Sequence, residues 1–164
     1  NTVGFAKDLA TLVSATSLVG FMLLQPLVGA LSDRIGRRPI LIAFGVAGTL
    51  GTVPLMSRLE SAQGPWEALA LILLALAVVS GYSSINAVVK AELFPVEVRA
   101  LGVGLPYAIT VSLFGGTAEY VALWFKQAGN EAGFYWYVTA CIACSLLVYV
   151  SMPDTRRTSR IDRD

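Results

Sequence analysis

Five long apolar blocks recur along the chain and leave few folds open to it. They cover residues 9–31, 40–56, 68–89, 100–125 and 134–152. A helix crosses the ~30 Å hydrocarbon core of a bilayer with about 20 apolar residues, and a secretory signal peptide would supply only one such block. Charged residues make up 14% of the chain, whereas an ordinary soluble domain has roughly 25%. The sequence therefore predicts an all-α membrane protein with five transmembrane helices.

The segments between the blocks are short, at residues 32–39, 57–67, 90–99 and 126–133. We therefore expect residues 1–153 to form one helical bundle in which consecutive helices are antiparallel neighbours, followed by a tail at 154–164. Small residues let membrane helices approach closely. Two stripes of them are expected to be packing surfaces: Ala43, Ala47 and Gly51, and Gly104, Ala108, Ser112 and Gly116.

Lysine and arginine are distributed unevenly between the two ends of the predicted helices. Nine lie on one side, namely Arg34, Arg37, Arg38, Lys90, Arg99, Arg156, Arg157, Arg160 and Arg163, and three on the other, namely Lys7, Arg58 and Lys126. Cytoplasmic loops carry the excess of positive charge, and Trp and Tyr gather at membrane interfaces. The aromatic groups Trp66, Trp124 and 134–137 fall on the side with fewer basic residues. We expect a multi-pass protein of the cell (inner) membrane, with loops 32–39 and 90–99 and the tail cytoplasmic.

The first of these basic loops reads GALSDRIGRRP, residues 29–39. Gly29 is expected to let another helix pack closely and Gly36 to permit the tight reversal. Asp33 can accept hydrogen bonds from arginine or a helix N-terminus. Arg34, Arg37 and Arg38 would anchor the turn on the cytoplasmic face; orientation charge alone is the simpler interpretation.

A second motif lies on the same face, in KAELFPVEVRALG, residues 90–102, with Glu92, Pro95 and Arg99. The two motifs together resemble those of the major facilitator superfamily, and E-x-F-P-x-x-x-R-x-x-G is similar to its metabolite:proton symporters. Residues 22–38 and 98–139 look like the corresponding segments of bacterial α-ketoglutarate permeases. This resemblance implies the C-terminal helical bundle of a twelve-helix transporter, with helices 8 to 12 present. Because the chain begins at Asn1 rather than Met, we expect a fragment whose partner is the missing N-terminal half.

The resemblance also implies a function. It is proton-coupled import of a small organic acid, such as the dicarboxylate α-ketoglutarate, by alternating access, with the proton gradient as coupling ion and no other cofactor. A dianion needs fixed positive charge, and no Arg or Lys falls well inside the predicted spans, so the basic substrate residues are expected in the absent half. The alternatives are another metabolite (another organic acid, shikimate or a betaine) and a membrane sensor or scaffold that moves no solute.

The acidic residues of the two loops suggest an inner gate. Asp33 and Glu92 can each pair with an arginine of the opposite loop, for example Asp33 with Arg99. We expect such pairs to form when the gate is closed and to break as the helices separate.

Four polar residues inside the spans are candidates for lining a cavity or handling protons. Glu119 is the ionisable one, expected to share a helix face with Ser112 and Gly115; the others are Gln25, Tyr82 and Asn86. Charge within a span is costly and often functional. Hydrogen bonding between helices, or for Glu119 with the outer interface, explains these residues about as well.

Other chemistry has little support in the residues. The chain has no histidine and only two cysteines, Cys141 and Cys144, so no zinc site can be completed. It also lacks a G-x-S-x-G elbow and a P-loop, and its net charge of +1 does not indicate nucleic acid. We therefore expect a protein that is not an enzyme, binds no metal or nucleic acid, and lies in the lipid bilayer.

Overall fold

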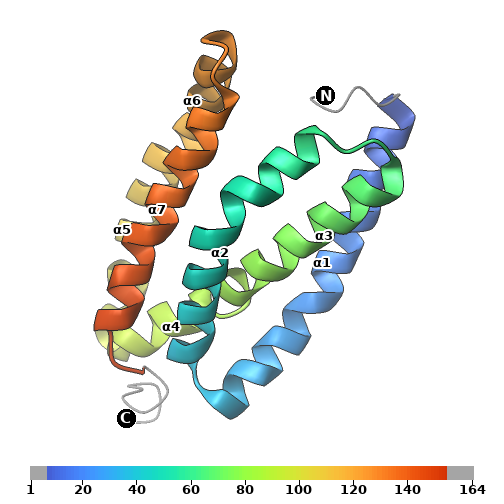
Figure 1. The fold of residues 1–164 in the computed structure, drawn as a ribbon. Helices are drawn as coiled ribbons and strands as arrows, with labels where there is room; N and C mark the ends of the chain where they lie inside the picture. Colours follow the sequence, from blue (N-terminus) through green and yellow to red (C-terminus); the bar gives the residue numbers. More distant parts are fainter. Residues whose placement is uncertain (1–6, 155–164) are drawn as a thin grey trace.

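The computed structural model describes residues 7–154, and within that range every regular element is helical (Figure 1). Five helical stretches are long and apolar enough to cross a membrane. Two are single helices at the start of the chain, α1 (Lys7–Ile35) and α2 (Arg37–Glu60), and α7 (Glu131–Ser151) is the last. The third stretch comprises α3 (Pro65–Ser83) and α4 (Asn86–Leu93), and the fourth comprises α5 (Val96–Thr110), the π-helical turn η1 (Val111–Gly115) and α6 (Gly116–Gln127). The predicted five-helix, all-α membrane fold is confirmed.

The helices extend beyond the apolar blocks that predicted them, so the connections are shorter than expected. Gly36 alone separates α1 from α2, and only Phe94 and Pro95 separate α4 from α5. Charged residues at a helix end reach past the hydrocarbon region while the backbone continues to satisfy its own hydrogen bonds. The predicted tail, apart from Asp154, lies outside the described residues.

The order of packing differs from the order along the chain. α2 packs most extensively against α7 and α3, and α1 packs against α3 (Figure 1). The expectation that consecutive helices are neighbours is therefore wrong for α1 and α2, which touch little because α3 lies beside both. The fourth stretch meets α7 mainly through α6, and in the described part of the chain none of its residues is buried.

The glycines that bring helices together are not those of the expected small-residue stripes. A Cβ added at Gly45 would lie 2.7 Å from Leu146 Cδ1 on α7, and one at Gly81 would lie 3.2 Å from Phe44 Cβ on α2. In contrast, the described residues leave open space at Gly51, Gly104 and Gly116, and Ala43, Ala47, Ala108 and Ser112 are exposed. None of the described helices packs closely on these glycines, because four-residue spacing identifies a helix face but not its neighbour.

Gly45 provides a direct test of the α2–α7 interface. Gly45→Ala should lower the free energy of unfolding by about 1 to 3 kcal/mol, because overpacking forces side chains and backbone to shift, and Leu146 Cβ would lie only 2.9 Å from the new methyl group. Thermal unfolding of the purified full-length protein measures the effect. Gly51→Ala, which meets no described atom within 4 Å, is the control, and equal unfolding of both variants would contradict the packing.

A small apolar core holds α2 to α4 at the end of the bundle where α1 meets α2. Its buried members are Ile40, Leu41, Ile85 and Val89. Tyr82 and Tyr149 pack against this core from α3 and α7. The start of α2 and the α3–α4 break are thereby fixed relative to each other, which positions the charged residues described next.

Candidate functional site

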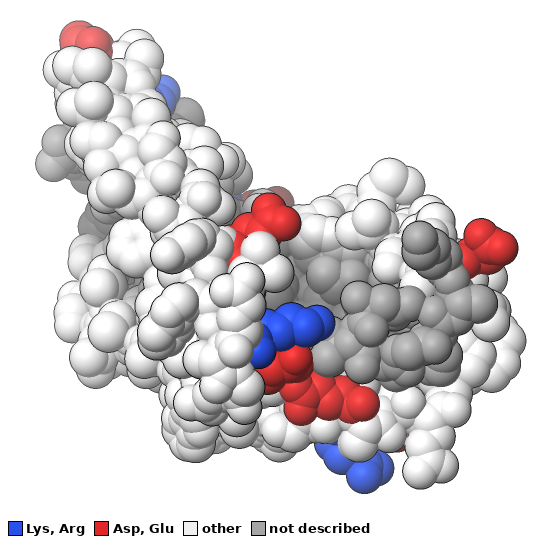
Figure 2. All heavy atoms as spheres, turned by 90° about the horizontal axis from the view of Figure 1, so that it is seen from above, with Lys and Arg blue, Asp and Glu red and all other residues white. Residues whose placement is uncertain are grey.

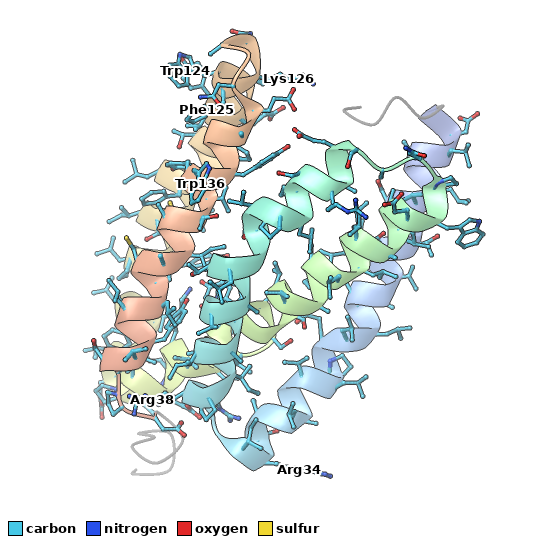
Figure 3. All side chains as sticks on the ribbon, viewed as in Figure 1. Arg34, Arg38, Trp124, Phe125, Lys126 and Trp136 are labelled. Carbon is cyan, nitrogen blue, oxygen red and sulfur yellow. The ribbon has the colours of Figure 1, made fainter. Side chains whose placement is uncertain are left out.

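The arginines of the first loop motif and two of the tryptophans lie at opposite ends of the bundle, as the sequence predicted. Arg34 and Arg38 lie at the end where α1 meets α2, whereas Trp124, Phe125, Lys126 and Trp136 lie toward the other end (Figure 3). Seen from that other end, most of the surface is uncharged, and basic and acidic side chains adjoin near its centre (Figure 2). The sidedness relative to the cytoplasm stays a prediction, and Arg156, Arg157, Arg160 and Arg163 lie outside the described residues.

Arg37 is the centre of the charged end. Its Nη1 donates to Asp33 Oδ1 at 2.6 Å and to Ser32 Oγ at 2.8 Å, and its Nη2 lies 3.4 Å from Glu92 Oε1 on α4. The side chains of Arg37 and Glu92 are only 11% and 5% exposed, whereas Asp33 is 68% exposed. A guanidinium can hold several acceptors at once because its five N–H donors have a fixed geometry. Arg37 therefore joins the two predicted motifs through a buried ion pair.

The expected pairing between the loops is confirmed for Glu92, which pairs with Arg37 of the opposite loop, but not for Asp33. Asp33 pairs with Arg37, four residues along its own segment, rather than with Arg99. Arg99 Nε donates to the carbonyl of Phe94 at the α4–α5 turn, 3.1 Å away, and Arg38 Nη2 donates to the carbonyl of Val150 on α7 at 2.5 Å. Helix continues through residues 33–35, so Asp33 lies close enough to Arg37 to take its guanidinium.

The predictions for the two glycines of the first motif have different outcomes. Gly36 has φ 103° and ψ 164°, a region open essentially to glycine alone, and its predicted role in the reversal is confirmed. The Asp154 carboxylate occupies the space beside it and accepts from the Arg37 backbone N–H at 3.2 Å. Gly29 was expected to admit another helix closely, but no described atom would lie within 4 Å of a Cβ there, because α1 presents that face to none of the described helices.

Gln25 bridges α1 to the break between α3 and α4. Its Nε2 donates to Ser83 Oγ at 2.8 Å, and Ser84 Oγ donates to its Oε1 at 2.7 Å. Tyr82, next to these serines, stacks on Phe44 of α2 with ring centroids 5.6 Å apart, and Asn86 begins α4. The structure thus gives Gln25 a hydrogen-bonding role between helices, and substrate contact at Gln25, Tyr82 or Asn86 stays a prediction.

The bridge can be tested through stability. Gln25→Met should lower the free energy of unfolding by about 1 to 2 kcal/mol, because a typical hydrogen bond contributes roughly 0.5 to 1.5 kcal/mol and two are lost. The comparison is Gln127→Met, at an exposed position at the end of α6. If the two variants have the same thermal midpoint, the hydrogen bonds of Gln25 do not stabilise the break between α3 and α4.

Glu119 lies in the first turn of α6, and its side chain is exposed in the described part of the chain. Ser112 and Gly115 belong to the π-helical turn η1, where hydrogen bonds run from i to i+5 rather than i to i+4. The regular α-helical spacing assumed for Ser112, Gly115 and Glu119 therefore does not hold through residues 111–115, and their shared face stays a prediction. None of the ion pairs between residues 7 and 154 involves Glu119, and its role in proton handling stays a prediction.

Lys90 is a residue that sequence reasoning assigned to a loop and that the structure places in a helix. It lies in α4, and its Nζ is 4.3 Å from the centroid of the Tyr107 ring on α5. Lys90, Tyr82 and Tyr107 line a cavity of about 300 Å³. The four-residue spacing of Asn86 and Lys90, which both lie in α4, was the signal that could have indicated that a polar helix face continues to Lys90.

Within residues 7–154 no group of three or more His, Cys, Asp or Glu side chains could hold a metal ion. Cys141 and Cys144 are exposed free thiols on α7. The arrangement at the charged end is one of ion pairs and hydrogen bonds that join helices, together with one lysine beside a cavity.

Comparison with known proteins identifies relatives of the chain. The family model of the Major Facilitator Superfamily matches residues 1–164. The chain is 48% identical over 148 residues to the alpha-ketoglutarate permease of Escherichia coli K12. The matched region covers 90% of this chain and 34% of that protein. It is 33% identical to the ectoine/proline transporter ProP of Corynebacterium glutamicum, covering 76% of the chain and 25% of the relative.

A third relative is the citrate-proton symporter of Salmonella typhi, 28% identical over 86% of this chain and 32% of that protein. The chain thus spans about a third or less of the length of these relatives. No solved structure matches.

Proposed function

The chain belongs to the major facilitator superfamily, and we propose that it forms part of a proton-coupled secondary transporter that imports a small organic acid by alternating access. In this proposal its five membrane-spanning stretches are helices 8 to 12 of twelve, and the remaining helices complete the transport path. The protein is a multi-pass membrane protein. We place it in the inner membrane, with the Arg37 end cytoplasmic because short cytoplasmic loops carry the excess of positive charge.

The cargo we propose is a dicarboxylate such as α-ketoglutarate. The observation that carries this choice is the 48% identity over 90% of the chain to a protein named alpha-ketoglutarate permease. Relatives named for ectoine, proline or citrate are less similar, at 33% and 28% identity. The name of the citrate-proton symporter also supports coupling to protons. With no histidine in the chain, a carboxylate such as Glu119 is the group within these helices that could carry a proton.

The charged end then acts as part of the inner gate. Arg37 holds α4 against α2 through Glu92, which fixes the inner ends of two membrane-spanning stretches together. Asp33 is largely exposed next to Arg37, so it is the acidic residue of this set that the rest of the transporter can reach. Exposed pairs contribute only ~0 to 1 kcal/mol each, so contacts there can bias the gate without locking it.

Uptake by the full-length transporter tests the proposed cargo. Cells expressing it should accumulate labelled α-ketoglutarate saturably, and excess unlabelled dicarboxylate should abolish the uptake. Citrate, shikimate, glycine betaine and proline serve as parallel substrates. Accumulation of betaine or proline with no uptake of any carboxylic acid would refute the organic-acid proposal.

The same assay separates a transporter from a sensor or scaffold that moves no solute. A sensor would show no uptake of any compound and would tolerate substitutions at Gln25, Tyr82, Asn86 and Glu119. The transporter names of the relatives give no support to an enzyme.

A further inference from the structure

We propose that the cavity between α4 and α5 is a carboxylate-binding subsite, in which the Lys90 ammonium binds one carboxylate of the transported acid and the hydroxyls of Tyr82 and Tyr107 add donors. This inference rests on the proposed function, since it gives the organic acid its first cationic contact within this chain. The resemblance of the two loop motifs to those of the major facilitator superfamily did not give Lys90 this role.

A lysine that only oriented the protein in the membrane would not need the position that Lys90 has. It lies in α4, inside the third membrane-spanning stretch, Pro65–Leu93. Lysines near a helix end usually extend their ammonium toward water. Instead, the Lys90 Nζ lies over the Tyr107 ring of the neighbouring helix α5, 4.3 Å from its centroid. Its charge is therefore directed against another helix of the bundle.

The partners of Lys90 leave it able to bind an anion. The ion pairs among residues 7–154 use Arg37, Arg58 and Lys126, and none uses Lys90. An ammonium carries three N–H donors, and a ring face below it satisfies only part of that capacity. Charges within membrane helices generally face a cavity or a partner. Lys90 has the cavity, and an anionic ligand would supply the partner.

The cavity has a suitable size and lining for a small acid. Its volume of about 300 Å³ lies at the lower end of the ~300 to 1,000 Å³ typical of small-molecule sites. Phe94, Val103 and Val111 make its wall apolar, and a charge interaction is stronger beside apolar walls than in water. Tyr82 is held by its stacking on Phe44, so its hydroxyl is positioned in advance.

One lysine accounts for one carboxylate. The second carboxylate of a dicarboxylate needs another cation, which fits a chain that spans only about a third of its relatives' length. The subsite should therefore affect the preference for dicarboxylates over singly charged analogues, and not only the overall affinity.

The test uses the full-length transporter with Lys90→Gln, Lys90→Arg and Lys126→Gln. Lys126 is the matched control, because its side chain is 52% exposed and its ion pair with Glu131 is 4.0 Å long. Lys90→Gln should raise the KM for α-ketoglutarate roughly 10- to 100-fold, the effect of losing one charged hydrogen bond. Lys90→Arg should restore much of the affinity, and Lys126→Gln should leave it unchanged. Immunoblots of the membrane fraction correct each rate for abundance.

Competition distinguishes binding from a structural role. In the wild type, unlabelled α-ketoglutarate should inhibit uptake at a much lower concentration than its γ-amide or its α-amide. Of these two amides, the one that removes the Lys90-bound carboxylate should lose its disadvantage in Lys90→Gln. If Lys90 only supports the helices, the three compounds should keep the same relative potency in that variant, which would overturn the inference.

The experiment also distinguishes a failure of the subsite from a failure of the proposed function. If the wild type accumulates the dicarboxylate and Lys90→Gln keeps its KM and selectivity, the subsite is wrong and the proposed function stands. If the wild type takes up no carboxylic acid, the proposed function fails and the subsite fails with it.

A second variant serves if Lys90→Gln does not reach the membrane. Tyr107→Phe keeps the ring under the ammonium and removes one hydroxyl. It should raise KM roughly 3- to 10-fold, and an unchanged KM would overturn the inference.

Discussion

Arg37→Gln should lower the free energy of unfolding by about 3 kcal/mol or more, because breaking a buried ion pair is strongly destabilising. The guanidinium lies 3.4 Å from the Glu92 carboxylate, and both side chains are nearly buried. The same substitution removes the hydrogen bonds to Asp33 and Ser32. It therefore weakens the α1–α2 turn and the α2–α4 contact together.

Thermal unfolding of the purified full-length protein measures this loss. The control is Arg58→Gln at the other end of the bundle, because the Arg58 side chain is 74% exposed and its Nη2 lies 4.0 Å from Glu67 Oε1. Exposed pairs contribute ~0 to 1 kcal/mol, so this control should unfold near the wild-type temperature. If Arg37→Gln and Arg58→Gln unfolded at the same temperature, the buried ion pair would not be what holds the helices together.

The gate hypothesis adds a second readout to the same variant. Without the Arg37–Glu92 contact the charged end should open more often, so a cysteine introduced at Glu97 in the first turn of α5 should react faster with a thiol reagent applied from the cytoplasmic side. Asp33→Asn should have a smaller effect in the same direction, because Asp33 is already exposed. Unchanged labelling rates in both variants would argue against a gate at this end.

Gly36→Ala should lower the free energy of unfolding by about 2 to 4 kcal/mol. A non-glycine residue held in this backbone region costs on the order of 1 to 3 kcal/mol. The new methyl group would also meet the Asp154 carboxylate. That carboxylate is bound by the Arg37 backbone N–H, so moving it away would cost a further hydrogen bond, worth about 1 kcal/mol.

The control for this prediction is Gly29→Ala in the same motif. Gly29 lies inside α1, where a Cβ meets no described atom within 4 Å, and alanine is favoured over glycine in a helix by roughly 0.5 to 1 kcal/mol. The two substitutions should therefore shift the thermal midpoint in opposite directions. A loss of stability at Gly29 equal to that at Gly36 would mean that a part of the transporter outside this chain packs against α1 there.

The number and positions of the helices could be predicted because hydropathy and length are local properties. Each predicted span lies within one helical stretch to within a residue, and the helices are longer because Ser32, Asp33 and Arg34 continue α1 beyond the apolar block. The break at Ser84 and Ile85 and the π turn at 111–115 interrupt stretches that hydropathy assigns to single continuous spans. The break at Ser84 and Ile85 is bonded to α1 through Gln25, and hydropathy does not contain such contacts.

The contacts of the charged end were predicted only in part. Opposite charges on two loops of one face indicated an ion pair, and the structure has one between Arg37 and Glu92. The assignment of Asp33 to Arg99 failed because loop positions do not determine how far a side chain reaches. Lys90 was treated as a loop charge because the apolar block ended at residue 89, whereas α4 continues to Leu93. No described helix packs against Gly29, since a motif does not show which helix faces it.

Uptake into proteoliposomes containing the full-length transporter tests the central claim most directly. With the exterior acidic and the interior alkaline, labelled α-ketoglutarate should accumulate inside above its external concentration, and a protonophore should collapse that accumulation. Reversing the pH gradient should drive the labelled acid out. Uptake that only equilibrates, and that is the same with either gradient or with none, would contradict proton-coupled import of an organic acid.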